Sequence, residues 1–194
     1  MHVSSPTRLV AQCREEKEAS LISFMSEVIE RARESAGETQ LQWSVLARNL
    51  ESPCARAIAK IAADQTSSLL AIRAIVLDAE TPALSHAGPS LPDIDIAELR
   101  ILKDARFTAA HEQLVLGETR VWIGDCMRRD PVKRDAFQLF HGDEPVAARH
   151  ARTSFERLWI KAGPAKTVLN TLVPGLVAAR ETAAKPSARP ASRR

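Results

Sequence analysis

The chain has 194 residues, of which 45% are apolar and 26% are charged, a composition typical of folded rather than disordered proteins. Its net charge of +3 allows an anionic partner without requiring one. Three widely spaced cysteines, Cys13, Cys54 and Cys126, argue against a disulfide scaffold and for a reducing compartment. We find no pattern of a secretory leader and no apolar run of about 18 residues, so we expect a cytoplasmic protein that does not contact a membrane.

Residues 1–38 are predicted to form one long amphipathic helix. Ser5 and Pro6 are typical of a helix start, and Gly37 is typical of a helix end. Apolar side chains recur at three- and four-residue steps between Leu21 and Ala32, which gives the helix one apolar stripe. Charged side chains, Lys17 and Glu27 among them, are assigned to the opposite face. The stripe packs either on the core of this domain or, as the alternative, on a partner chain.

Residues 39–163 are predicted to form a mixed α/β core. The apolar residues of 39–50 fit both a strand and a helix, and we favour the helix. Ser52 and Pro53 mark the start of a helix over residues 52–64. Residues 70–78 are rich in β-branched and aliphatic side chains and predict a buried strand, and residues 96–102 predict a second one.

The second half of the core is predicted to be a hairpin, a strand and a closing helix. The hairpin joins residues 114–116 to residues 120–123 through a turn with Gly117, and an alternating strand follows over residues 136–141. Asp143 is expected to cap a helix that continues to about residue 162. Such an order indicates a mixed β-sheet flanked by helices.

Residues 164–194 are rich in proline, alanine and arginine. Such a composition buries too little apolar surface to fold on its own. We therefore expect a mostly disordered basic tail.

The order of elements between residues 52 and 162 resembles one half of a phospholipase D superfamily domain. In that family, the hairpin begins with His-x-Lys-x4-Asp, a Gly-Ser-x-Asn turn follows, and the closing helix often ends in Phe-x-x-Leu-Trp. Residues 73–78 (RAIVLD) and 98–102 (ELRIL) look like the two lead strands. The signature falls on residues 111–124 (HEQLVLGETRVWIG), and Phe155 to Trp159 (FERLW) is similar to the end of the closing helix.

The signature itself is degenerate. His111 stands at the place of the family's nucleophile, which forms a covalent phospho-histidine. Gln113 replaces the lysine, and Glu118 stands at the place of the aspartate. Gly124 arrives one residue early, and the next residues, beginning with Asp125, replace the Ser-x-Asn that would bind phosphate.

These departures weaken the chemistry that the resemblance implies. A glutamine amide at 113 offers the transition state a weaker hydrogen bond than a lysine cation, and loss of one such donor typically costs on the order of 3 kcal/mol. An acid at Asp125 would add like-charge repulsion to a bound phosphate. The family uses two histidines, so one motif per chain requires a homodimer in which the two His111 side chains approach each other.

Two functions follow from the resemblance. The first is a pseudoenzyme, a non-catalytic regulatory or interaction protein that forms a homodimer and binds an acidic protein or a phosphate-bearing partner. The alternative is a single-motif phosphodiesterase or nuclease that acts through His111 and Glu118 as a homodimer, with Arg128 or Arg129 in the role of the missing lysine.

One loop of this chain is strongly basic. Its charges either hold an anion, such as a phosphate, a nucleic-acid backbone or an acidic protein surface, or pair locally with Asp130 and Asp135. Weak nucleic-acid binding through this loop and the tail stays an alternative. The candidate anion-binding residues are Arg128, Arg129, Lys133 and Arg134.

Neither a metal nor a cofactor is expected. The histidines and cysteines lack the close spacing of zinc ligands, and no nucleotide-binding or serine-hydrolase motif occurs. Cys126 lies near basic residues that could lower its pKa, although a packed thiol is the commoner outcome. The three tryptophans are predicted to pack in the core, with Trp122 as a candidate lining of a pocket beside the motif: Trp43, Trp122 and Trp159.

Overall fold

The chain begins with alternating strands and helices and continues with a run of strands before its last helix in the computed structural model, which describes residues 6–10, 13–34, 40–64, 70–77, 91, 94, 97–103 and 110–164 without 127–136. In chain order the elements are β1 (Thr7–Val10), α1 (Arg14–Glu34), β2 (Leu41–Ala47), α2 (Pro53–Asp64), β3 (Leu70–Val76), β4 (Ala97–Ile101), β5 (His111–Leu116), β6 (Arg120–Cys126), β7 (Phe137–His141), α3 (Pro145–Lys161) and β8 (Gly163–Pro164).

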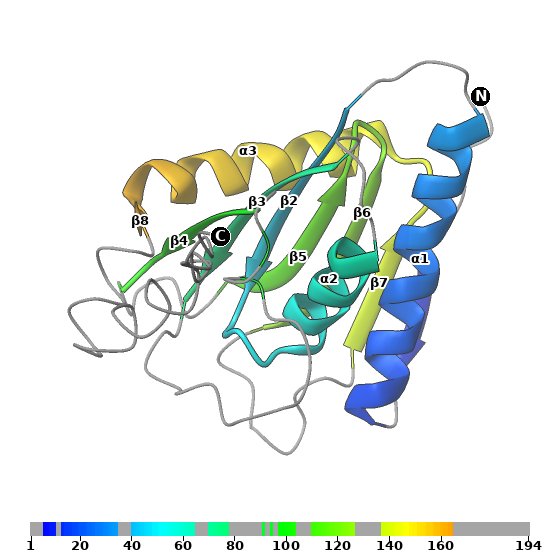
Figure 1. Ribbon diagram of the computed structural model, residues 1–194, viewed down its shortest axis with the longest axis horizontal. Coiled ribbons are helices and arrows are strands. Elements are labelled where there is room, and N and C mark those ends of the chain that lie inside the picture. The colour runs from blue at the N-terminus through cyan, green and yellow to red at the C-terminus, as the bar shows by residue number, and fades with distance from the viewer. Residues whose placement is uncertain are drawn as a thin grey trace, which may run out of the picture.

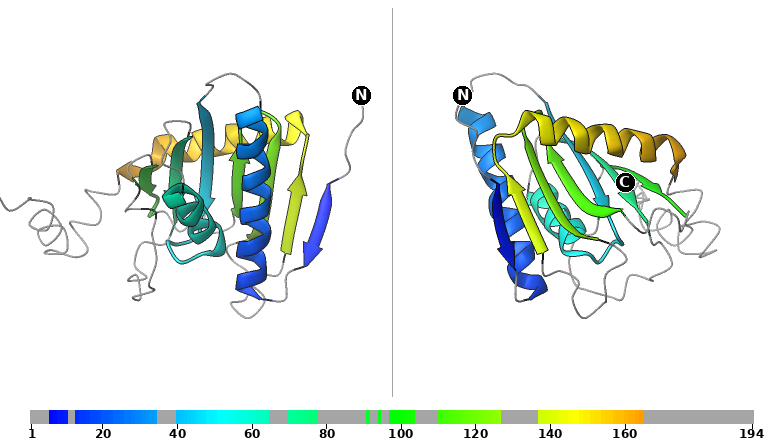
Figure 2. Two further views of the ribbon diagram at one scale, coloured as in Figure 1. Left: turned by 45° about the vertical axis from the view of Figure 1, so that its right-hand side comes forward. Right: turned by 180° about the vertical axis from the view of Figure 1, so that it is seen from behind.

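All the described strands form one mixed sheet in the order β1-β7-β6-β5-β2-β3-β4-β8 (Figure 1). Strands β2, β3 and β4 are parallel neighbours, and the other pairs are antiparallel. Helices α1 and α2 cover one face, and α3 crosses the other (Figures 1 and 2). The mixed α/β sheet flanked by helices is therefore confirmed.

The larger core lies between the sheet and helices α1 and α2. Trp43 of β2 and Trp122 of β6 are almost completely buried there. The apolar stripe of α1 packs into this same core, so the first of its two expected partners, the domain itself, is confirmed. The division of the chain after residue 38 stays a prediction. The stripe residues buried in this core are Leu21, Phe24, Met25 and Ile29.

The smaller core lies under α3. Phe155 and Trp159 stack there with ring centroids 5.4 Å apart. The guanidinium groups of Arg73 and Arg100 each lie 4.2 Å from the Trp159 ring, and Arg100 also donates to the Trp159 carbonyl at 3.0 Å. Cation–π contacts of this kind fix the C-terminal end of α3 to strands β3 and β4. Core packing of all three tryptophans is thus confirmed.

The helix predicted over residues 39–50 is wrong, because this segment contains strand β2. The strand pairs with β3 on one side and β5 on the other. Its side chains are buried on both faces of the sheet, with Trp43 under α1 and α2 and Leu46 under α3. A central strand covered on both faces loses the alternation of apolar and polar residues, which is why the pattern also fitted a helix.

Two predicted helix starts are also wrong. The first helix begins at Arg14 and not at Ser5, because β1 pairs with the edge of β7. The closing helix begins at Pro145, and the residue before it, Glu144, makes no side-chain capping bond. Asp143 is therefore not the cap, since a proline at the first helical position starts the helix one residue later.

The other predicted elements are confirmed. Helix α2 follows Ser52, whose hydroxyl accepts the Ala55 N–H at 3.3 Å, and β3, β4, β7 and the β5–β6 hairpin lie where they were expected. The basic loop of Arg128–Arg134 and the tail after Pro164 lie outside the described residues. No helix in the described part of the chain is long and apolar enough to span a membrane.

Replacement of Leu21 tests whether α1 belongs to this core. Leu21 is fully buried, so Leu21→Ala should lower the free energy of unfolding by about 2–5 kcal/mol, measured by urea denaturation. The exposed Glu30 offers a control, and Glu30→Ala should change stability by less than about 0.5 kcal/mol. Unchanged stability in Leu21→Ala, together with dissociation of an oligomer, would instead assign the stripe to a partner chain.

Candidate functional site

The motif positions lie on the β5–β6 hairpin, at a break in its regular pairing. His111 pairs with Cys126, and Gln113 pairs with Ile123, so β6 has one more residue than β5 over this stretch. The result is a β-bulge, which bends a strand and redirects its side chains. Gly124 and Asp125 are the two residues of β6 that share the space opposite Glu112.

Gly124 is required here by packing. A Cβ at this position would collide with the indole of Trp122 and lie 3.3 Å from the Cβ of Glu112. The glycine therefore allows close approach of the buried indole. Trp122 itself is fully buried, so it lines no open pocket beside the motif.

His111 is exposed to solvent. Its Nδ1 lies 2.9 Å from the Gly124 carbonyl oxygen. A carbonyl oxygen only accepts, so Nδ1 carries the proton and, in the neutral ring, Nε2 has the free lone pair. The ring is thus fixed with a basic nitrogen available to a ligand.

The Gln113 side chain is hydrogen-bonded to another element of the fold. Its Nε2 donates to the Ala151 carbonyl of α3 at 3.2 Å. The side chain at the lysine position therefore joins β5 to α3, and it brings no cation to the surroundings of His111.

Glu118 lies at the other end of the hairpin. His111 is the first residue of β5, and Glu118 follows the last one, Leu116. The strand between them spans roughly 17 Å. The Glu118 carboxylate is exposed and pairs with Arg152, with Nη1 and Oε2 2.9 Å apart. The structure therefore does not bring Glu118 and His111 together.

Asp125 lies in a buried charge cluster on the α1 face of the sheet. The ammonium of Lys17 is 3.5 Å from Asp125 Oδ2 and 3.9 Å from Glu112 Oε2, and it lies 5.2 Å from the centre of the Trp122 ring. Asp125 also accepts the Phe137 N–H at 3.1 Å, and Glu112 accepts a backbone N–H at 3.2 Å.

The expected repulsion between Asp125 and a phosphate on His111 is therefore corrected. The bulge turns this carboxylate toward α1, where Lys17 compensates its charge. Sequence reasoning missed Lys17 and placed it on the polar face of the helix. Its spacing was the available signal, because positions 17, 21 and 25 follow one another at four-residue steps along the buried stripe.

The cysteines and histidines assemble no metal site among the residues that the structure describes. Cys54 is buried, and burial raises the pKa of its thiol well above its ordinary value, with the Glu112 carboxylate adding to the rise. Cys13 is exposed and Cys126 is half-buried.

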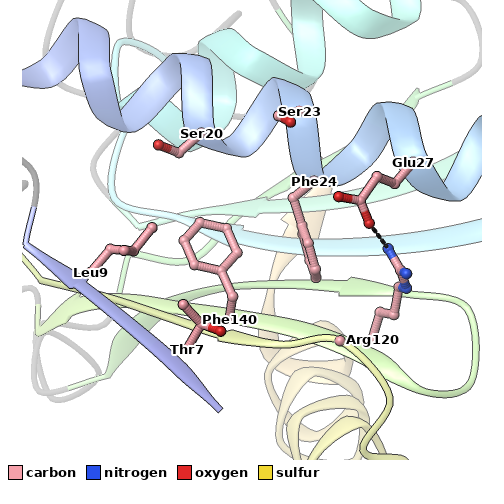
Figure 3. Close-up of a pocket in the computed structure, with 9 residues that line it drawn as sticks. Thr7, Leu9, Ser20, Ser23, Phe24, Glu27, Arg120 and Phe140 are labelled. Carbon is pink, nitrogen blue, oxygen red and sulfur yellow. Dashed lines mark hydrogen bonds and ion pairs between the residues drawn. The ribbon is translucent and has the colours of Figure 1, made fainter. Parts of the chain in front are cut away.

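An open hollow lies away from the motif, between α1 and strands β1 and β7 (Figure 3). It has a volume of about 440 Å³. Phe24 and Phe140 meet edge to face at its floor, 5.1 Å between ring centroids, and Arg120 pairs with Glu27 at one end, 3.1 Å apart. None of the motif residues lines it.

Comparisons with known proteins bear on the fold. No protein-family model matches this sequence, and no curated protein matches it either. Among solved structures, TrmBL2, an archaeal chromatin protein with a novel mode of DNA binding, matches with a TM-score of 0.53 at 11% identity over 83% of this chain and 55% of its own. NucT from Helicobacter pylori matches with a TM-score of 0.51 at 13% identity, over 82% of this chain and 98% of its own.

A third solved structure, the phospholipase D family member Nuc from Salmonella typhimurium, matches with a TM-score of 0.48 at 9% identity, over 82% of this chain and 98% of its own. The fold is phospholipase D-like, as the match to NucT shows. The resemblance of the element order is confirmed at the level of the fold, and at these identities the likeness concerns the fold alone. This chain spans about 55% of the length of TrmBL2.

Replacement of Lys17 tests the buried cluster of this phospholipase D-like domain. Lys17→Met should lower the free energy of unfolding by about 3–5 kcal/mol, because it removes the ammonium group that lies beside two buried carboxylates. The triple variant Lys17→Met/Glu112→Gln/Asp125→Asn should recover most of that loss in the same urea denaturation. Lys103→Met, at an exposed lysine after β4, is the control and should change stability by less than about 0.5 kcal/mol. A triple variant less stable than Lys17→Met would contradict the inference that Lys17 compensates the charges of Glu112 and Asp125.

Thiol alkylation tests the assignment of the cysteines. The thiolate is the reacting form, so the raised pKa and burial of Cys54 should leave it unmodified by iodoacetamide at mildly alkaline pH, while the exposed Cys13 reacts. Cys54 should react once urea unfolds the chain. Peptide mass spectrometry measures each site, and rapid labelling of Cys54 in the folded protein would refute its burial.

Proposed function

We propose that this chain is a non-catalytic interaction module built on a phospholipase D-like domain. The observation that carries the proposal is the hydrogen bond of the Gln113 amide to the backbone of α3. Gln113 stands at the position where the family's motif has a cation. The contacts of Asp125 with Lys17 and of Glu118 with Arg152 support it as well.

The physical argument concerns charge at the transition state. Phosphoryl transfer spreads negative charge over the phosphoryl oxygens, and catalysis depends on positioned cations and donors that stabilise it. In the described part of the chain, the motif supplies His111 and no cation directed at a phosphate. A site of this kind can bind an anion weakly without accelerating the cleavage of its ester.

The partner that we propose is anionic. An acidic protein, a phosphate-bearing molecule and a nucleic acid all satisfy this, with Arg128, Arg129, Lys133 and Arg134 as the proposed contacts. A nucleic acid is favoured by the likeness of the fold to TrmBL2, which is described as a DNA-binding chromatin protein. The proposed homodimer rests on the phospholipase D resemblance alone, because the apolar stripe of α1 is used within the chain.

No metal or cofactor enters this function, and a cytoplasmic location remains part of the proposal.

One observation favours the alternative of a homodimeric phosphodiesterase or nuclease. The exposed His111 keeps the tautomer that a nucleophile needs. In that alternative, two copies of His111 meet across a twofold axis, and Arg128 or Arg129 supplies the cation.

Phosphodiesterase assays separate the two functions. The unmodified protein should hydrolyse bis(p-nitrophenyl) phosphate no faster than His111→Ala, because the motif residues that the structure describes bring no cation to the ring. Gln113→Ala, which removes the α3 contact but leaves His111 in place, is the control for a folding defect. Hydrolysis that the His111→Ala variant abolishes, and that Gln113→Ala retains, would establish the enzyme and overturn the proposal.

A further inference from the structure

The solvent-facing side of α3 carries basic and hydroxyl side chains and no exposed acid. Its opposite side packs on β5, β6 and the smaller core through Ala148, Ala151 and Phe155. The one carboxylate within the helix, Glu156, is half-buried and pairs with Arg73, with Nη2 and Oε2 3.1 Å apart. The exposed polar residues of the helix are Arg149, His150, Thr153, Ser154, Arg157 and Lys161.

Four of these residues form one row, which we call the α3 ridge: Arg149, Thr153, Arg157 and Lys161. They follow one another at four-residue steps, so neighbours lie on the same side of the helix about 6 Å apart along its axis. The row therefore presents cations and a hydroxyl at a regular spacing over roughly 18 Å.

The two arginines of the α3 ridge are not neutralised within the structure. Among the described residues, neither Arg149 nor Arg157 forms an ion pair, whereas Arg152 of the same helix is paired with Glu118. The Thr153 hydroxyl donates to the Arg149 carbonyl at 2.9 Å, a bond within the helix that leaves both guanidinium groups in solvent.

Helix α1, on the other face of the sheet, is acidic at its surface. Its exposed residues include five carboxylates and three basic groups. Helix α2 on that same face adds the basic Arg56 and Lys60, which pair with Glu18. Because α1 and α3 cover different faces of the sheet (Figure 2), the charge difference between these two helices favours the approach of a polyanion from the α3 side. The residues counted on α1 are Glu15, Glu16, Glu27, Glu30 and Glu34, and Arg14, Arg31 and Arg33.

We propose that the α3 ridge binds the phosphate backbone of double-stranded nucleic acid. This inference rests on the proposed function and names its partner. Guanidinium groups match phosphate oxygens in bidentate geometry, and a row of cations at regular steps suits a ligand whose charges also repeat. The row has no aromatic side chain, so it lacks the stacking that single strands use, and contacts to phosphate alone select no base sequence.

A membrane surface fits the α3 ridge less well. A helix that lies on a membrane buries its apolar face in the lipid, whereas the apolar face of α3 is covered by the sheet. The large apolar side chains exposed on α3 are Val146 and Ile160, at the two ends of the helix.

Fluorescence anisotropy with a labelled duplex DNA of arbitrary sequence, at several salt concentrations, tests the proposal on the full chain. The variant Arg149→Gln/Arg157→Gln should bind roughly tenfold more weakly at low salt, and the slope of log K against log salt should fall by about 1.8, since each phosphate contact contributes about 0.9. Arg31→Gln/Lys60→Gln removes two charges from the opposite layer and should bind like the unmodified protein. Thermal unfolding by circular dichroism confirms that each variant is folded.

The other outcomes overturn the proposal that the α3 ridge binds nucleic acid. If the unmodified protein binds duplex DNA and Arg149→Gln/Arg157→Gln binds equally well with the same slope, the contact lies elsewhere and the interaction module stands. If no DNA binds, or if only phosphatidylserine vesicles bind, the partner is not nucleic acid. Failure of the proposed function appears separately, as hydrolysis that depends on His111.

Discussion

The ammonium group of Lys17 holds together the part of this fold that carries the degenerate motif. It comes from the first turn of α1, lies over the Trp122 ring, and approaches one carboxylate from each strand of the hairpin. Burial of three charged groups is costly unless each finds partners. Here backbone N–H groups from Arg48 and Phe137 complete the cluster. The position of α1, the bulge in β6 and the direction of Asp125 therefore depend on one another.

This constraint divides the motif between the two faces of the sheet. On the α1 face, Asp125 is part of a compensated ion cluster. On the α3 face, the amide of Gln113 is bonded to the helix backbone. His111 is exposed to solvent, and its ring is hydrogen-bonded to a carbonyl of the bulge. A phospholipase D-like fold is thus combined with motif side chains that stabilise the fold, which is the ground for the binding function that we propose.

Much of the fold could be predicted from the sequence because its signals are local. The β-branched run of β3, the Ser52 cap and the turn at Gly117, whose φ is +61°, each specify their own element. Strand β2 could not be recognised by its pattern, since burial on both faces removes the alternation. Strand β1 depends on the edge of β7, which lies far away in the sequence.

The site was less predictable because its decisive contacts join distant segments. The sequence places Gln113 at the position of the family's lysine, but nothing local indicates that its amide donates a hydrogen bond to the Ala151 carbonyl. A glycine inside the strand pattern, at position 124, was the available sign of the bulge in the sequence. A bulge turns the residues beside it, so a linear reading directed Asp125 to the wrong face and left Lys17 without a role.

The most direct measurement is crystallographic, with tungstate soaked into crystals of the unmodified protein as a mimic of the phosphoryl group. If the motif lacks the means to stabilise that group, the map should show no metal oxyanion bonded to the imidazole of His111. A tungsten atom within bonding distance of His111 Nε2, with cationic side chains around its oxygens, would contradict the account and identify a working catalytic centre.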